Sequence, residues 1–360
     1  MLKKTAICIA LSTLLIGANA QAVTVFENKD GDNLEVYGEV GVGGHIGAKN
    51  EYGEFYTNDK TYIDDSFATL GMKGNYDKTY YRLELDFERE NWEYGSGDMV
   101  LAIDKVFIGY KFADTHAIEF GLTDTALDDY DKFGDFTFDT TVETGEAGDQ
   151  ANTVKYEGSA SDFKMGISYS YNGESASGSA LGDVINGYVG YFSEYIDIAI
   201  GAETRTGSKG ESKYGEQFLF AAGLRAHINE QLSIGVNGYI ENEDISQEKE
   251  LLEADEDPDE EVYRYNDYQT LQNKGALISA RYKYTPKIHF TASANYEAYE
   301  EWDISSPLGV SEDDEYSWGK ERTWTTLGII YKPSSSVAFA FEANFGEAAQ
   351  HAYAYSRVYF

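Results

Sequence analysis

Residues 232–241 read LSIGVNGYIE, and this stretch decides the fold. Leu232, Ile234 and Val236 are apolar, and small or polar residues stand between them. Successive side chains of a β-strand point to opposite faces, so a period of two predicts a strand with one apolar and one polar face. The same alternation occurs in three further stretches, at residues 81–88, 278–284 and 337–344. The chain is therefore expected to form a sheet that is apolar on one side and hydrated on the other.

Sixteen such segments follow one another along the chain. They begin near Leu34, Phe67, Tyr80, Val100, His116, Thr153, Phe163, Asp183, Tyr195, Gln217, Gln231, Gly275, Ile288, Thr323, Ser336 and His351. Short turn-like breaks alternate with longer, mostly acidic ones. An even number of strands, with short turns at one rim and long loops at the other, is typical of outer-membrane barrels. We therefore expect an all-β fold, a transmembrane 16-stranded antiparallel β-barrel with short periplasmic turns and long extracellular loops.

The composition of the 360-residue chain excludes several other classes. A net charge of −35 argues against a protein that binds nucleic acid or an anionic membrane surface. The lone Cys8 excludes a disulfide framework, and the five scattered His argue against a zinc site, so no cofactor or metal is expected. A secreted β-sandwich or β-solenoid would also alternate, but a sandwich would have fewer loops of roughly 20–30 residues.

The first 22 residues have the pattern of a secretory signal peptide. Lys3 and Lys4 precede an apolar run at 5–16, and small residues at 18–22 fit cleavage after Ala20 or Ala22. The apolar run is shorter than the roughly 20 residues that a membrane-spanning helix needs. We expect residues 1–22 to be removed and 23–360 to form a single barrel domain.

Three motifs resemble a known family. Residues 25–38 read VFENKDGDNLEVYG, similar to the opening of the general trimeric porins of Gram-negative outer membranes. Residues 68–74, ATLGMKG, resemble the second strand of that family, and residues 109–114, GYKFAD, resemble the end of its fourth strand. The final Phe360 is similar to the terminal aromatic residue that serves as the family's membrane-insertion signal.

The resemblance implies a location, a function and partners. It implies an outer-membrane homotrimer that lets small hydrophilic solutes and ions diffuse passively. Its partners would be lipopolysaccharide, outer-membrane lipid and the barrel-assembly machinery. It also implies that the third long loop folds inside the barrel and forms the constriction.

That third loop spans residues 123–148 and is strongly acidic. Its candidate constriction residues are Asp124, Asp128, Asp129, Asp131, Asp135, Asp139 and Glu143. Carboxylates at a narrow point attract cations and repel anions. From residues alone, a solvated surface loop is an equal alternative, and the family position favours the constriction.

The facing wall departs from the family pattern. Glu39 and Thr69 stand where the family often has Lys and Arg. The alternation predicts that Lys73 and Arg82 face the channel, and the fourth-strand match falls near Asp104 or Lys105. Part of the expected basic wall is therefore missing, which points to a cation preference.

Other features leave alternatives open. The stretch 241–261 holds twelve acids and one Lys, and a disordered solvated run is favoured over weak divalent binding. The four Trp residues (92, 302, 318 and 324) are expected to form an interfacial girdle rather than a sugar-binding entrance. The small residues sharing a face with Phe360 favour a subunit contact.

Three other functions are alternatives to the diffusion channel. An oligosaccharide-preferring porin would need an aromatic track inside the channel. A barrel enzyme would need a nucleophile beside a base, and no His is near a distinctive Ser in sequence. A purely structural or adhesive barrel would show no conductance.

Overall fold

The structure is a computed structural model. It describes residues 22–46, 62–91, 96–138, 142, 144–175, 178–208, 210, 212–246, 249–254, 261–265, 268–299, 320–346 and 351–360. The strands in these ranges form one 18-stranded sheet and one separate two-stranded sheet. Among the same residues, no helix has the length and apolar character needed to cross a membrane.

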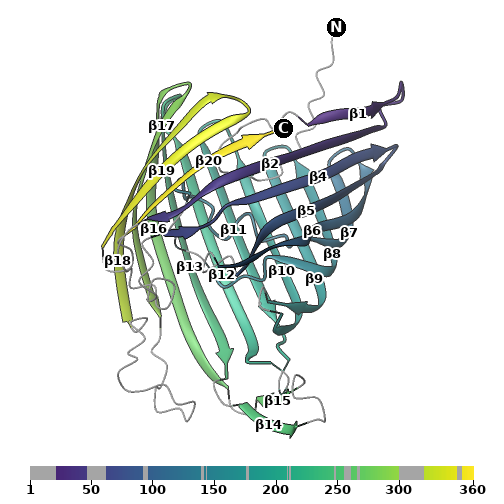
Figure 1. Cartoon of the computed structure of the whole chain (residues 1–360), viewed down its shortest axis with the longest axis vertical. Coiled ribbons are helices and arrows are strands. Elements are labelled where there is room, and N and C mark those ends of the chain that lie inside the picture. Colours follow the sequence, from purple (N-terminus) through teal and green to yellow (C-terminus); the bar gives the residue numbers. More distant parts are fainter. Residues whose placement is uncertain are drawn as a thin grey trace.

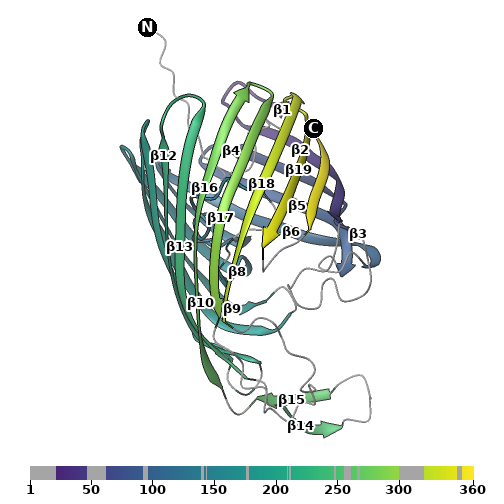
Figure 2. The ribbon, with the colours of Figure 1, turned by 90° about the vertical axis from the view of Figure 1, so that its left-hand side faces the viewer.

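Sixteen strands of the large sheet form a closed antiparallel barrel (Figures 1 and 2). They are β2 (Asn33–Ile46), β4 (Phe67–Tyr76), β5 (Thr79–Asn91), β6 (Ser96–Ala113), β7 (His116–Asp124), β8 (Asp149–Ala160), β9 (Phe163–Glu174), β10 (Ala180–Phe192), β11 (Ile196–Arg205), β12 (Tyr214–His227), β13 (Leu232–Ile245), β16 (Gln269–Thr285), β17 (Ile288–Tyr299), β18 (Lys320–Ser334), β19 (Val337–Gly346) and β20 (Ala352–Tyr359). Each pairs with the next along the chain, and β20 pairs with β2 to close the wall. The expected 16-stranded barrel is confirmed.

The closing pair joins the two ends of the described chain. The Gly38 amide donates to the Phe360 carbonyl at 2.9 Å, and the Phe360 amide donates back to Gly38 at 3.0 Å. Strand β1 (Val23–Glu27) pairs with the first half of β2, beyond the part that β20 covers. Closure leaves no open sheet edge in the wall, as a spanning sheet requires.

The two faces of the wall differ as the alternation predicts. On β13, Val236 and Ile240 point outward and are 45% and 53% exposed, whereas Asn237 and Glu241 point inward and are buried. A lipid bilayer covers such an outer apolar face, and the inner polar face is where water and charged groups can be accommodated.

Strand boundaries are accurate at one rim and less so at the other. At the short-turn rim, defined by the turns that join β4–β5, β12–β13 and β16–β17, every expected start lies within one residue of the observed one. At the opposite, long-loop rim, most strands begin three to six residues earlier than expected, as β16 does at Gln269. The ladder continues there because backbone pairing does not require an apolar outer face.

Three short strand regions were not expected. Besides β1, these are β3 (Tyr62–Asp64), which pairs with β2, and the hairpin of β14 (Lys249–Ala254) with β15 (Glu261–Tyr265). The hairpin corrects the expectation of a disordered run at 241–261. The first residues of that stretch also belong to a strand, because β13 continues to Ile245. Local cross-strand pairing orders a segment that its charge alone marks as solvated.

Candidate functional site: the barrel interior

The connection between β7 and β8, residues 125–148, lies against the inner wall and is called the inner loop. Its backbone amides donate to side chains of several strands: Leu127 to Asn186 on β10, Phe138 to Glu342 on β19, Gly145 to Glu241 on β13 and Ala147 to Glu203 on β11. The loop therefore crosses the interior from β10 to β19 and returns. It narrows the barrel at this level.

Two wall glycines allow the loop backbone to touch the wall. A Cβ on Gly223 would overlap the Phe133 carbonyl, and one on Gly235 would overlap the Gly134 carbonyl. Gly134 itself has φ +121°, which side-chain-bearing residues rarely adopt. Ser279 Oγ donates to the same Gly134 carbonyl at 2.7 Å and fixes the contact.

Apolar and aromatic side chains hold the loop in place. Leu127 and Phe133 are almost fully buried within the cluster between the loop and the wall. The Tyr130 ring stacks on Tyr188 of β10, with centroids 3.6 Å apart. Trp324 of β18 belongs to this inner cluster, so its expected place in a lipid-facing girdle is wrong. Trp92, Trp302 and Trp318 lie outside the described residues.

Two predicted constriction residues make hydrogen bonds within the loop itself. Asp131 accepts a hydrogen bond from Thr144 at 3.0 Å and so joins the outgoing and returning limbs. Asp135 accepts from the amide and hydroxyl of Thr137. Both carboxylates are buried. Their role in a constriction stays a prediction, and Asp139 and Glu143 lie outside the described residues.

A second pair also links the limbs. The charges of Asp128 and Glu146 interact across the loop, and Glu146 accepts a hydrogen bond from the Gly148 amide at 2.8 Å. Burial and the neighbouring Asp128 charge hold the pKa of Glu146 well above its usual range. Burial also raises the pKa of Asp128. Two adjacent buried carboxylates repel, so the fold favours the protonated form of Glu146.

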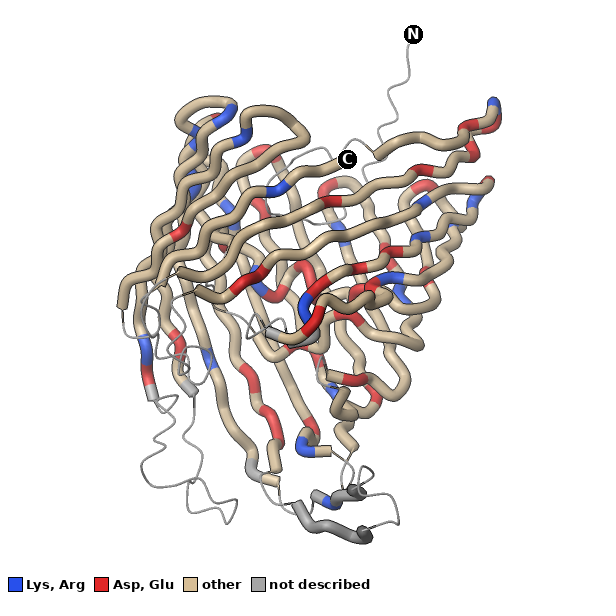
Figure 3. The backbone as a smooth tube through the Cα atoms, in the orientation of Figure 1, with Lys and Arg blue, Asp and Glu red and all other residues tan. Residues whose placement is uncertain are grey.

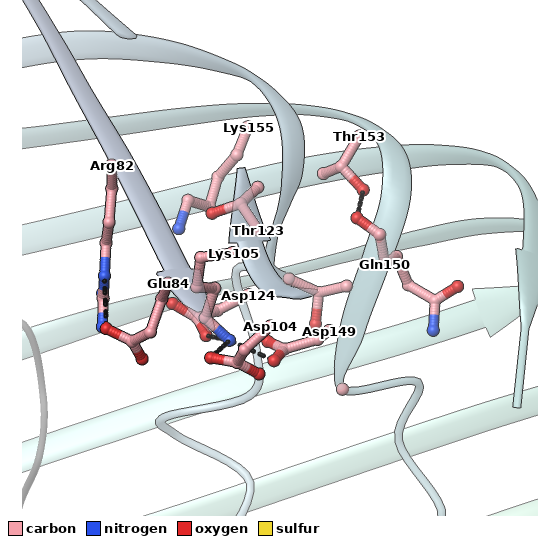
Figure 4. A network of polar contacts seen from close by, with 12 residues as sticks. Arg82, Glu84, Asp104, Lys105, Thr123, Asp124, Asp149, Gln150, Thr153 and Lys155 are labelled. Atoms are coloured by element: carbon pink, nitrogen blue, oxygen red, sulfur yellow. Dashed lines mark hydrogen bonds and ion pairs between the residues drawn. The ribbon is translucent and has the colours of Figure 1, made fainter. Parts of the chain in front are cut away.

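Lys105 of β6 binds both stems of the inner loop (Figure 4). Its ammonium lies 2.7 Å from Asp124 at the end of β7, contacts Asp149 at the start of β8, and lies 3.4 Å from Asp104. A bulge between β5 and β6 lets consecutive residues Asp104 and Lys105 face the same region. Asp124, Asp128 and Asp149 have oxygens close enough to share a cation, and the ammonium supplies that charge.

The other predicted wall residues also face inward and have partners. Glu39 lies 3.8 Å from Arg357 of β20, and Lys73 lies 3.6 Å from Glu35. Thr69 lies directly across the β4–β5 ladder from Asp86. Arg82 binds the carboxylate of Glu84 at 2.7 Å (Figure 4) and the hydroxyl of Tyr37 at 2.6 Å.

A recess of about 320 Å³ opens beside these groups. It is lined by cationic, anionic and aromatic side chains together, among them Lys73, Arg82, Lys155, Asp129, Tyr80 and Phe107. The recess offers both charge signs next to aromatic rings. It is therefore suited to small polar solutes in general.

Sequence reasoning missed two features of the interior. His227 binds Asp197 at 2.8 Å and lies 3.4 Å from Ser233, a contact in space that the search for a His close to a distinctive Ser in sequence did not identify. These residues lie on adjacent strands, so only the register shows it. Arg225 and Arg281 also face inward, and their distances from acids become visible only in the structure.

No protein-family model matches the chain. Curated relatives include a "Monosaccharide porin" of Halomonas sp, 31% identical over 138 residues, and "Outer membrane porin F" of Salmonella typhimurium, 30% identical over 130. The aligned segments cover 36% and 34% of this chain, and the chain spans only 35% and 32% of those relatives.

Solved structures match over the whole barrel. A loop-deletion form of OmpT, an outer membrane protein of Vibrio cholerae, has a TM-score of 0.66 at 16% identity and covers 91% of this chain and 99% of its own. Salmonella typhi OmpF, solved with daunomycin, has a TM-score of 0.66 at 14% identity, with coverage of 94% and 100%.

The fold, the motifs and the sequence matches agree on one class, a multi-pass β-barrel of the Gram-negative outer membrane. Within that class, the matched segments, which cover about a third of the chain, resemble general porins, and the fold is the same as theirs.

Proposed function

We propose that this chain forms a water-filled channel through which small hydrophilic solutes diffuse passively across the outer membrane. The observation that carries the proposal is the inner loop, which lies inside a closed polar barrel and is hydrogen-bonded to wall strands on opposite sides. A sixteen-stranded barrel leaves an aqueous lumen, and a loop within it sets the size limit. Porin relatives support the same function.

A cation preference is the finer part of the proposal. Glu88 lies on the β4–β6 side of the interior, where the negative charges of Asp65, Asp86 and Asp104 repel its carboxylate. Asp86 has a buried carboxylate oxygen without a hydrogen-bond partner in the described residues. Acidic positions outnumber basic ones along the chain (Figure 3). Such a wall attracts cations, most strongly at low salt, where screening is weak.

The proposed channel is a homotrimer and has no catalytic activity. Small side chains cover the outer face of β20, where lipid-facing strands elsewhere carry large apolar ones. The Ser233–His227–Asp197 contact does not form a catalytic triad in this proposal. The distance from Ser233 to His227 is 3.4 Å, which is long for a nucleophile and its base, and Ser233 is buried. The backbone of Ser233 is also paired with strands on both sides.

A sugar-preferring porin is the second candidate. Tyr80 and Phe107 line the recess in an edge-to-face arrangement with centroids 6.2 Å apart, and aromatic rings can stack on sugars. One curated relative bears the name monosaccharide porin. Stepwise block of the current by glucose or maltose, absent with sodium gluconate, would favour this candidate.

Conductance of the purified protein in a planar bilayer under a KCl gradient tests the main proposal. We expect conductance in steps of three and a reversal potential of cation-selective sign. Asp86→Asn with Asp104→Asn should move that potential toward zero, whereas Asp114→Asn, at the exposed short-turn rim, should not. An anion-selective sign would refute the cation preference, and absence of conductance would refute the channel.

A further inference from the structure

The described cations of the barrel interior include two contrasting groups. One group is paired with acids: Arg82 with Glu84, Lys105 with Asp124, Lys155 with Glu119, Arg205 with Glu243, Arg322 with Glu297, and Arg357 with Glu39. The other group contains Arg225 of β12 and Arg281 of β16. Neither has an acid within ion-pair distance among the described residues.

These two guanidinium groups lie against the rings of the inner loop. The Arg225 Cζ atom is 3.9 Å from the Phe133 ring centroid, and the Arg281 Cζ atom is 4.6 Å from that of Phe136. Arg225 also lies 5.6 Å from Phe136, so the two cations share a neighbour. Stacking on a ring covers the flat face of a guanidinium and leaves its N–H edge for a planar or tetrahedral oxyanion.

Several hydrogen-bond donors around the pair lack partners. The Nε atoms of Arg225 and Arg281 are buried and unpartnered. Thr291, directly across the ladder from Arg281, is 4% exposed, and its hydroxyl is buried without a partner. A buried donor without a partner is costly, so three of them in one region indicate a ligand that would satisfy them.

The terminal nitrogens of the two arginines differ from the Nε atoms. Only the Nε atoms are both buried and unpartnered, and no hydrogen bond within the described residues involves either guanidinium. The terminal nitrogens are not among the buried atoms without a partner, so they are the part of each guanidinium that is left for a ligand.

The nearest acids are already engaged elsewhere. Asp197, across the ladder from Arg225, binds His227 at 2.8 Å, and Asp135 binds Thr137. Repulsion by Arg281 is the largest charge interaction of Arg225 and exceeds the attraction of either acid. Lys332 of β18 adds a further positive charge near Arg281. The local field therefore favours an anion, although the chain as a whole is acidic.

We propose that Arg225, Arg281 and Thr291 form an oxyanion-binding subsite on the inner wall, beside the inner loop and opposite the acidic β4–β6 side. Its ligand class is a small solute bearing a phosphate, sulfate or carboxylate group. Arginine edges bind such groups bidentately, and the Thr291 hydroxyl adds one donor. The subsite would hold the anionic group of a passing solute while the acidic wall attracts its cationic group or counter-ion.

Isothermal titration of the folded, detergent-solubilised protein with inorganic phosphate at low ionic strength tests the subsite. We expect saturable binding that chloride at equal ionic strength does not reproduce. Arg225→Gln and Arg281→Gln should each weaken binding about tenfold, the loss expected for one charge-assisted contact. Arg281→Lys keeps the positive charge but cannot bind an oxyanion through two parallel N–H groups. It should therefore give an intermediate loss of phosphate affinity.

Arg322→Gln is the matched control, because it removes a positive charge from the same interior but from an ion pair with Glu297. Its phosphate affinity should equal that of the wild type. If phosphate fails to bind, or binds the Arg225→Gln/Arg281→Gln double variant as tightly as the wild type, the subsite does not exist. Binding is measured at equilibrium in detergent, so this outcome is independent of whether the barrel conducts.

Discussion

The ammonium of Lys105 lies 2.7 Å from Oδ1 of Asp124 and also contacts Asp149, so one side chain of β6 joins the two stems of the inner loop. The lysine side chain is 7% exposed. Removing one partner of a buried ion pair leaves an uncompensated charge, which costs more than the pair itself contributes.

Lys105→Met is expected to lower the free energy of unfolding by about 3 kcal/mol, because Asp104, Asp124 and Asp149 then repel each other without a cation. Urea unfolding in micelles measures the change. The matched control is Lys73→Met, whose ion pair is 3.6 Å long and whose side chain is 44% exposed, with an expected cost of about 0–1 kcal/mol. Equal losses in the two variants would contradict the special role of Lys105.

The contact between Gly235 and the inner loop gives a second prediction. Gly235→Ala places a methyl group against the Gly134 carbonyl, so we expect the loop to shift off the wall. The expected cost is about 1–3 kcal/mol, with an altered single-channel conductance. Gly238→Ala on the same strand is the control, because its added Cβ would meet nothing closer than 3.3 Å. An unchanged conductance in Gly235→Ala would show that the loop tolerates the displacement.

Stability should depend on pH through Glu146. Its pKa is raised by burial first and by Asp128 second, so the folded protein keeps a proton that the unfolded chain releases above a pH of about 4.3. The free energy of unfolding therefore falls as the pH rises from there toward the raised folded value, by at most about 1.4 kcal/mol per pH unit. Glu146→Gln should remove this slope and stabilise the protein at neutral pH.

Urea titrations between pH 4 and 8 provide the measurement. Glu230→Gln, in an exposed turn, should leave the pH profile parallel to that of the wild type. A Glu146→Gln profile that is also parallel would mean that burial and Asp128 do not raise the pKa of Glu146 in the folded protein.

The outer face of β20 leads to a prediction about assembly. Ala354 lies on that face between Ala352 and Ser356, so Ala354→Trp is expected to disrupt the proposed trimer. Light scattering after gel filtration should show a lower mass. Ile200→Trp, on an outward position of β11 that is 47% exposed, should leave the mass unchanged. A wild-type protein that is monomeric would refute the assembly itself.

The wall strands could be predicted because lipid on one side and water on the other impose strict alternation, which is visible in residues 232–241. Strand β1 could not be predicted in this way. All five of its residues are exposed, so no difference between its two faces imposes an alternation on its sequence. At the long-loop rim, most strand starts were predicted several residues too far along the chain. Backbone pairing there continues beyond the point where the apolar face stops, as β16 illustrates.

The candidate site was predictable only in part. Alternation correctly placed Lys73 and Arg82 on the inner face. It could not show that Glu39 meets Arg357, because this contact depends on closure between distant parts of the sequence. It also could not show that Arg225 lacks an acid partner, since that depends on the register of β11, β12 and β16 and on the path of the inner loop.

The pairing of Gly38 with Phe360 has a consequence for how the barrel forms. Every other neighbouring pair of the wall joins strands that follow one another in sequence, whereas β2 and β20 lie near opposite ends of the described chain. Local hairpins can form early at small entropic cost, but this last pairing must close a very large loop. Until it does, the growing sheet has two unpaired borders that can bind other chains, so the seam between β2 and β20 is where misassembly is most readily started or prevented.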